Sequence, residues 1–129
     1  MSGNVASCTF PHGPEAPRDA RRWVGDTVGR LGWRGDEDEL ALLVSEVVTN
    51  AVRYTADAIG ITVYAHDCGL WVSVADDGGG RVAPRAADLD DLGGRGLQIL
   101  DLLCTTWGVV DDRAGKAVWF ELACHTGMG

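Results

Sequence analysis

The chain has 129 residues, a length that suits one compact domain rather than two. A hydrophobic fraction of 46% excludes a disordered chain, and no apolar run reaches the about 18 residues that a membrane-spanning helix needs. The net charge of −8 disfavours direct binding to nucleic acid, because an acidic surface repels the phosphate backbone.

The N-terminal part of the chain predicts a short edge strand over residues 4–10 and a helix over residues 18–31, where apolar residues recur at helical spacing. Gly32 and Gly35 follow this helix and favour its end. The strand and the helix are separated by a predicted rigid loop, whose turn-forming residues are Pro11, Gly13, Pro14 and Pro17.

A second, strongly amphipathic helix is predicted over residues 37–54. Asp36 is a plausible N-cap, and Glu39 follows it at the spacing of a capping box. The apolar stripe that we expect to face the core consists of Leu40, Leu43, Val44, Val47 and Ala51.

The rest of the chain predicts two strand pairs around a polar segment. Residues 59–66 and 70–76 alternate apolar and other side chains and form a predicted hairpin. Residues 77–94 are rich in Gly and Asp, and a helix is predicted over residues 95–105. The last two predicted strands are residues 106–111 and 116–123, which flank a turn at residues 112–115.

This order of elements predicts an α+β fold. Because the strands come in hairpins, we expect a two-layer sandwich in which a mostly antiparallel sheet carries its helices on one face. Residues 1–129 would form one domain, with an ordered core over about residues 4–123.

Three polar side chains share one edge of the second predicted helix. At 100° per residue, Glu46, Asn50 and Arg53 fall within a sector of roughly 60°, beside the apolar stripe. The arrangement brings a carboxylate, an amide and a guanidinium together. A solvated flank of an amphipathic helix is the alternative interpretation.

The predicted strand 70–76 ends on a carboxylate that is followed by glycines. Asp76 has the same parity as Leu70, Val72 and Val74, so it points inward if they do. A buried carboxylate needs hydrogen-bond donors, and the exocyclic amine of adenine is one. Gly78 and Gly80 would let the backbone pass close to a flat ligand; a turn with a solvated aspartate is the alternative.

A glycine-rich segment precedes the last predicted helix. Gly94 and Gly96 would expose backbone N–H groups that bind phosphate oxygens, and Arg95 would add a charged fork. Taken alone, this signal is weak, because glycines also form turns and helix caps.

Together the three segments resemble the N, G1 and G2 boxes of the GHKL superfamily of Bergerat-fold ATP-binding domains, over roughly residues 4–123. The resemblance implies that Glu46 is a general base, that Asn50 holds Mg²⁺ through its amide oxygen and that Arg53 approaches the phosphates. By the same resemblance the residues of the nucleotide site are Asp76 for the adenine amine, Gly78 and Gly80 of the G1 box, and Gly94, Arg95 and Gly96 of the G2 box, with residues 81–92 as a short lid. ATP and Mg²⁺ are the expected ligands.

Within the superfamily, segments 46–55, 93–97 and 116–122 look most like the anti-sigma-factor serine/threonine kinases. This likeness implies phosphorylation of a Ser or Thr on a STAS-domain antagonist, binding of a sigma factor, and a possible homodimer. Trp23, Trp33 and Trp71 could form such a contact or belong to the core. One departure is Ala117, near which the family often has a hydroxyl residue that helps to bind adenine.

Alternative functions stay open at this point. A non-catalytic, nucleotide-dependent protein-binding module of the same fold is the main one, and the Ala117 departure mildly favours it. The ATP-binding part of a split histidine kinase is disfavoured, since no helix carries a phosphoacceptor histidine. A gyrase-like ATPase would need a further domain that supplies a lysine.

The compartment is expected to be the cytoplasm. Four cysteines occur without a C-x-x-C pair, which favours reduced thiols in a reducing compartment. Residues 1–13 show no basic start followed by an apolar stretch, so no secretory signal is predicted.

Overall fold

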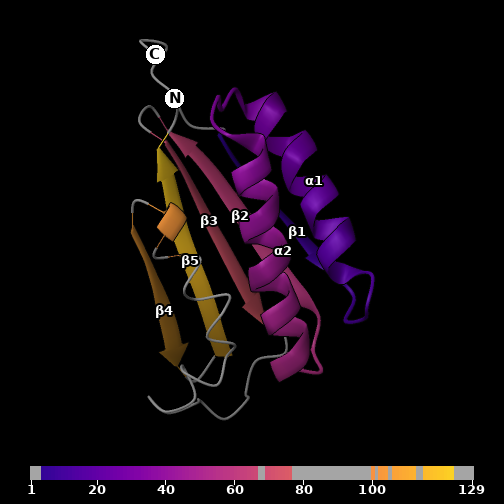
Figure 1. Cartoon of the computed structure of the whole chain (residues 1–129). Coiled ribbons are helices and arrows are strands. Elements are labelled where there is room, and N and C mark those ends of the chain that lie inside the picture. Colours follow the sequence, from indigo (N-terminus) through magenta and orange to yellow (C-terminus); the bar gives the residue numbers. More distant parts are fainter. Residues whose placement is uncertain are drawn as a thin grey trace.

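The computed structural model is a two-layer α+β sandwich, with helices α1 and α2 side by side on one face of a five-stranded sheet (Figure 1). It describes residues 4–66, 69–76, 100, 102–104, 106–112 and 115–123. The elements in chain order are β1 (Val5–Phe10), α1 (Ala16–Leu31), α2 (Glu37–Tyr54), β2 (Ile59–His66), β3 (Gly69–Asp76), β4 (Thr106–Asp112) and β5 (Gly115–Ala123). The predicted fold class is confirmed.

The sheet has the order β1-β2-β3-β5-β4, and every described pair of neighbours is antiparallel. β3 lies at its centre, between β2 and β5. The chain therefore brings β5 next to β3 although about forty residues separate them in sequence. This pairing positions the candidate site described below.

Helix α1 begins at Ala16, two residues earlier than predicted. The placement of Pro17 in the preceding loop was wrong, since this residue lies in the first turn of the helix. Proline is tolerated there because the first N–H groups of a helix have no partner within the helix. The predicted end is confirmed: Gly32 caps the helix with φ of 90°, a left-handed conformation that favours glycine.

Helix α2 has the predicted bounds, because its start is fixed by a side-chain cap. Oδ1 of Asp36 accepts hydrogen bonds from the backbone N–H groups of Asp38 and Glu39, both at 3.0 Å. These bonds satisfy two donors that the helix itself leaves unpaired.

Replacing Asp36 with Ala should therefore destabilise the protein by about 1 kcal/mol, the usual cost of losing an N-cap. Urea unfolding at equilibrium measures this difference. Asp36→Ser keeps an oxygen that can cap the helix and should recover most of the lost stability. An alanine variant as stable as the wild type would contradict the capping role.

The core lies between the helices and the sheet. Four of the five residues of the predicted stripe on α2 are buried, and Ala51 is partly buried. The sheet contributes side chains of one parity from each central strand. The buried hydrophobic residues of β2, β3 and β5 are Ile59, Ile61, Val63, Ala65, Leu70, Val72, Val74, Phe120 and Leu122. This alternation confirms that the even-numbered residues of β3 face the helices.

The tryptophans flagged by the sequence are mostly part of this core or lie against it. Trp33 is buried, and Trp23 packs edge-on against Phe10 with ring centroids 6.0 Å apart. Trp71 is half-buried and has the opposite parity to the buried residues of β3, so it faces away from the helices. Of the three, only Trp71 lies on the outer face of the sheet.

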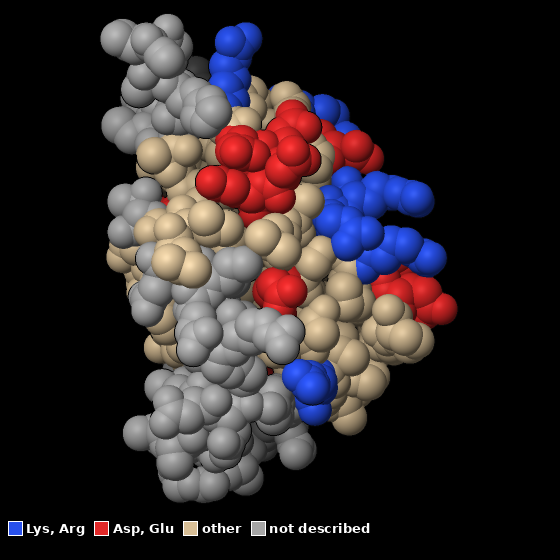
Figure 2. All heavy atoms as spheres, in the orientation of Figure 1, with Lys and Arg blue, Asp and Glu red and all other residues tan. Residues whose placement is uncertain are grey.

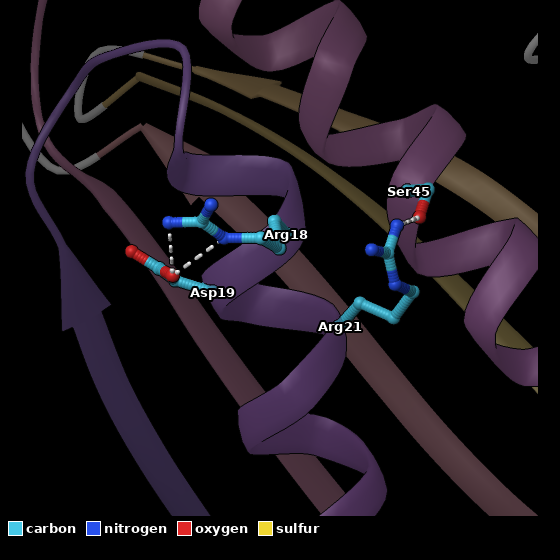
Figure 3. A network of polar contacts seen from close by, with 4 residues as sticks. All are labelled: Arg18, Asp19, Arg21 and Ser45. Carbon is cyan, nitrogen blue, oxygen red and sulfur yellow. Dashed lines mark hydrogen bonds and ion pairs between the residues drawn. The ribbon is translucent and has the colours of Figure 1, made fainter.

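One polar contact on the surface of the helix layer joins α1 to α2, and a second lies within α1 (Figure 3). Nη1 of Arg21 donates to Oγ of Ser45 at 2.8 Å, which links the two helices. The ion pair between Arg18 and Asp19, at 3.4 Å, is exposed and contributes little. The link to Ser45 therefore helps to hold the middle of α2, next to Glu46.

The last predicted helix is described at residues 100, 102 and 103, which are helical. Leu100 is buried, and its carbonyl accepts a hydrogen bond from the N–H of Cys104 at 2.9 Å. Cys8 and Cys104 form no disulfide bond within the part of the chain that the structure describes. No helix among the described residues is long and apolar enough to cross a membrane.

Candidate nucleotide-binding site

A pocket lies where the end of α2 meets the end of β3 and the start of β5. The empty space at this pocket is about 370 Å³, a volume that includes the part that is open to solvent. Its described lining combines an apolar wall with a few polar side chains, as ligand pockets usually do. The lining residues are Val47, Asn50, Ala51, Thr55, Val74, Asp76, Lys116 and Val118.

Asp76 lies at the end of β3 and lines this pocket. Because Val72 and Val74 are buried, the alternation of the strand turns Asp76 to the same, helix-facing side. Its Oδ1 is buried, and no described residue makes a hydrogen bond to it. A buried carboxylate oxygen without a donor is unfavourable, so the pocket presents an acceptor that a ligand could satisfy.

Asn50 lines the same pocket from α2, one turn before the helix ends. Val47 and Ala51 flank it on the lining side. The structure thus brings the two residues on which the sequence hypothesis depends, Asn50 and Asp76, to one cavity. Their positions agree with the prediction that a carboxylate and an amide face a common ligand.

The other predicted residues of α2 lie nearby but outside the described lining. Glu46 is half-buried and precedes Asn50 by four residues, which places both on neighbouring turns of one helix face. Arg53 is exposed in the last turn. The remaining predicted site residues lie outside the described residues: Gly78, Gly80, Gly94, Arg95, Gly96 and the lid 81–92.

Lys116 lines the pocket and was not among the predicted site residues. It has the same parity as Val118, Phe120 and Leu122, so the alternation of β5 turns it toward the helices. In the sequence analysis, Ala117 was the residue at which the chain departs from the hydroxyl residue that is frequent in the family. In the described structure Ala117 has the opposite parity, and the pocket is lined by Lys116 instead.

Thr55 is the second polar lining residue that the sequence did not single out. It follows α2, and its N–H donates to the carbonyl of Ala51 at 3.1 Å. Its hydroxyl donates to Oδ2 of Asp57 at 3.2 Å and accepts from the N–H of Asp57 at 3.0 Å. This local turn fixes the hydroxyl of a residue that lines the pocket, and a Thr-x-Asp pattern after a helix is its only sequence signal.

Charge is unevenly distributed over the helix layer. Figure 2 shows acidic side chains gathered over the start of α2, where Glu37, Asp38 and Glu39 form the first turn, and basic side chains over α1. The net charge of −8 therefore does not make every face of the molecule acidic.

No cluster of three or more His, Cys, Asp or Glu side chains suited to a metal occurs in the described part of the chain. A cation at this pocket would need most of its ligands from elsewhere, for example from phosphate oxygens. Among the described lining residues, Asn50, Thr55 and Asp76 carry side-chain oxygen atoms of the kind that bind such a cation.

Comparison with known protein families matches residues 35–125 to the family described as "Histidine kinase-, DNA gyrase B-, and HSP90-like ATPase". The match covers more than half of the chain and includes α2, β3, β5 and all the described lining residues of the pocket. No curated protein matches the chain significantly.

Proposed function

The chain belongs to the family of histidine kinase-, DNA gyrase B- and HSP90-like ATPase domains, and from this premise we propose that its pocket binds ATP with Mg²⁺. One observation carries this assignment. The buried, unpartnered Oδ1 of Asp76 and the side chain of Asn50 line a single cavity inside the matched region. In this arrangement Asp76 would bind the adenine, and Asn50 would bind Mg²⁺ together with the phosphates.

The adenine would lie with its exocyclic amine at Asp76. That amine donates the hydrogen bond that Oδ1 lacks among the described residues. The apolar side chains of Val47, Val74 and Val118 provide surfaces on which the ring can be buried. The polar contact selects the orientation of the base, and the apolar walls supply most of the favourable burial.

The residues present fit a magnesium ion that is held mainly by the nucleotide. Asn50 would contribute its amide oxygen, and phosphate oxygens and water would supply the other ligands. When bound, Mg²⁺ neutralises charge on the phosphates. From the sequence, Arg53 and Arg95 would face the phosphates, and Gly78, Gly80, Gly94 and Gly96 would let the backbone approach the nucleotide.

Replacing Asn50 with Ala should weaken ATP binding in the presence of Mg²⁺ by about tenfold, the effect of losing one hydrogen bond or ligand to a charged group. Isothermal titration with and without Mg²⁺ measures it. Binding measured in EDTA should be much less affected by the substitution. Thr49→Ala, at an exposed neighbouring position, is the matched control. Equal Mg²⁺ dependence in the wild type and Asn50→Ala would refute the metal role.

We further propose that the protein acts as a regulatory serine/threonine kinase of the anti-sigma-factor type. Glu46 would accept the proton of a Ser or Thr hydroxyl on a STAS-domain antagonist. The hydroxyl oxygen then bonds to the γ-phosphorus, the bond to the β-phosphate oxygen breaks, and ADP leaves. The support for this role is the position of Glu46 one turn from Asn50 on α2.

Phosphotransfer tests this function directly. Purified protein is incubated with γ-labelled ATP, Mg²⁺ and candidate STAS-domain partners from the same genome, and label on the partner is followed by mass spectrometry. Acid-stable label on Ser or Thr supports the kinase assignment. ATP binding without transfer to any partner would replace it with the nucleotide-dependent binding module. Failure to bind ATP would remove both.

Partner binding is tested by comparing pull-downs with ATP–Mg²⁺, with ADP–Mg²⁺ and without nucleotide. In the proposed circuit, binding of a sigma factor or of the antagonist changes with the nucleotide. Sedimentation of the purified chain tests the proposed homodimer.

A further inference from the structure

The end of α2 lines the pocket, and a side chain from another part of the molecule holds it. Asn50 and Ala51 lie close to the end of the helix, and Thr55 is its C-cap. Nε2 of His12 lies 2.9 Å from the backbone carbonyl oxygen of Val52, in the last turn of the same helix. Because a carbonyl oxygen only accepts hydrogen bonds, Nε2 of His12 carries the hydrogen and donates it.

The two helices of the layer end in different ways, which explains why α2 uses this contact. The last four carbonyl groups of a helix have no partner within the helix. In α1, Gly32 adopts a φ of 90°, and the chain folds back so that backbone N–H groups bond to the final turn. In α2, the C-cap Thr55 is extended, with a φ of −142°, and its N–H bonds to the carbonyl of Ala51. The next carbonyl, that of Val52, receives its hydrogen bond from His12.

His12 is itself held in place on both sides. Two residues before it, Phe10 is buried, and its ring packs edge-on against Trp23. Directly after it, the carbonyl of Gly13 accepts a hydrogen bond from the N–H of Ala16 at 3.1 Å. The loop between β1 and α1 thus brings the imidazole to the end of the helix layer at which α2 ends (Figure 1). Because these contacts already fix the loop, little further conformational entropy is lost when the hydrogen bond forms.

The contact joins a segment outside the matched family region to the proposed nucleotide site. His12 precedes the matched residues 35–125, whereas Val52 and Asn50 lie within them. A displacement of about 1 Å is enough to misplace a group that must meet a ligand in a defined geometry. The position of the last turn of α2 therefore matters for a side chain that would reach Mg²⁺ and the phosphates.

We propose that His12 is a positioning residue for ATP binding. Its hydrogen bond to the carbonyl of Val52 fixes the last turn of α2, and with it the amide of Asn50. This role rests on the proposed function, that the pocket binds ATP with Mg²⁺.

The first test measures ATP binding by isothermal titration, with Mg²⁺ and in EDTA. His12→Ala should weaken binding in Mg²⁺ by about three- to tenfold, the loss that corresponds to one neutral hydrogen bond. In EDTA, where Asn50 has no metal to bind, the loss should be about twofold or less. Equal losses of affinity in the two conditions would overturn the role, because the turn would then not act through Asn50.

The matched control is Asp36→Ala, which removes the cap at the other end of α2. At 1.5 Å per residue, that cap lies about 21 Å from Asn50 along the helix. Each variant removes one capping contact from the same helix, so a merely structural role would give both the same ATP affinity. The positioning role predicts that Asp36→Ala retains the wild-type affinity. Thermal unfolding without nucleotide verifies that both variants are folded, and the same loss of affinity in both would overturn the proposal.

Conservative variants separate the hydrogen bond from the imidazole ring. The amide nitrogen of a glutamine can lie about as far from the backbone as Nε2 of a histidine, so His12→Gln should restore most of the lost affinity. His12→Asn carries the same donor on a shorter side chain and should not restore it. Equal losses in the glutamine and asparagine variants would overturn the hydrogen bond as the cause.

A double-mutant cycle tests whether His12 acts through Asn50. In Mg²⁺, the variant with both His12→Ala and Asn50→Ala should bind ATP within about twofold of Asn50→Ala alone, because the amide that the turn positions is already absent. If the two losses of affinity multiply in full, the proposed route through Asn50 is wrong.

Hydrogen exchange of the protein without nucleotide observes the contact itself. In His12→Ala, amide exchange measured by peptide mass spectrometry should become faster at the end of α2 and stay unchanged at its start, since fewer contacts then hold the last turn. Asp36→Ala should show the opposite pattern. Unchanged exchange at the end of α2 in His12→Ala would contradict the anchoring of this turn.

Failure of this inference can be distinguished from failure of the proposed function. If the wild type binds no ATP, both are wrong. If ATP binds in a manner that depends on Asp76 and Asn50, while His12→Ala binds ATP as well as the wild type does, the pocket is confirmed and only the role of His12 is wrong.

Discussion

Replacing Asp76 with Ala is expected to weaken ATP binding by about a hundredfold. The variant removes the carboxylate that meets the adenine amine and leaves that buried donor without a partner. A hydrogen bond to a charged group contributes about 1.5–3 kcal/mol, and the upper part of this range corresponds to about a hundredfold in affinity. Calorimetry or competition with a fluorescent ATP analogue measures the change.

The same variant should fold as well as the wild type without nucleotide. Oδ1 of Asp76 is buried with no hydrogen bond from any described residue, so removing it costs no bond made by that atom. We expect the free energy of unfolding to stay the same or to rise, as often happens when a functional polar group is removed from a pocket. Loss of affinity together with a large loss of stability would instead indicate a structural role for the carboxylate.

A further control uses Ser73, which is half-buried on the same strand but has the opposite parity. Ser73→Ala should bind ATP like the wild type, because its side chain points to the other face of the sheet. Equal losses in the Ser73 and Asp76 variants would mean that distortion of β3, rather than contact with the base, weakens binding.

The elements that the sequence predicted well are those fixed by local interactions. Helix α2 has its predicted bounds because Asp36 caps its first turn and its apolar residues repeat with the helical period. The start of α1 was missed by two residues, because Pro17 was interpreted as a loop residue although the first turn of a helix accepts proline.

The candidate site was predictable only in part, because only some of its residues are positioned by local interactions. Parity along β3 was enough to turn Asp76 inward, and the helical period was enough to place Asn50 beside the core. The position of Lys116 beside Asp76 depends on the pairing of β3 with β5, two strands that are distant in sequence. A single sequence contains no local signal for such a register, and Lys116 was therefore not among the predicted site residues.

Replacing Glu46 with Gln is expected to lower the rate of phosphotransfer by about 10²- to 10⁴-fold, the range for loss of a general base. Glutamine retains the shape of the side chain and one acceptor oxygen but cannot accept the hydroxyl proton. Single-turnover transfer from γ-labelled ATP to the Ser or Thr of the STAS-domain partner measures this rate, with ATP held above saturation.

The separation of binding from catalysis makes this test specific. Glu46 lies outside the described lining of the pocket, so Glu46→Gln should bind ATP within about threefold of the wild type, less than the loss of one hydrogen bond would cause. Glu37→Gln makes the same chemical change at an exposed position of the same helix and should leave the rate unchanged. A Glu46→Gln variant that transfers phosphate at the wild-type rate would exclude Glu46 as the base. A parallel loss of ATP binding would assign Glu46 to the nucleotide site instead.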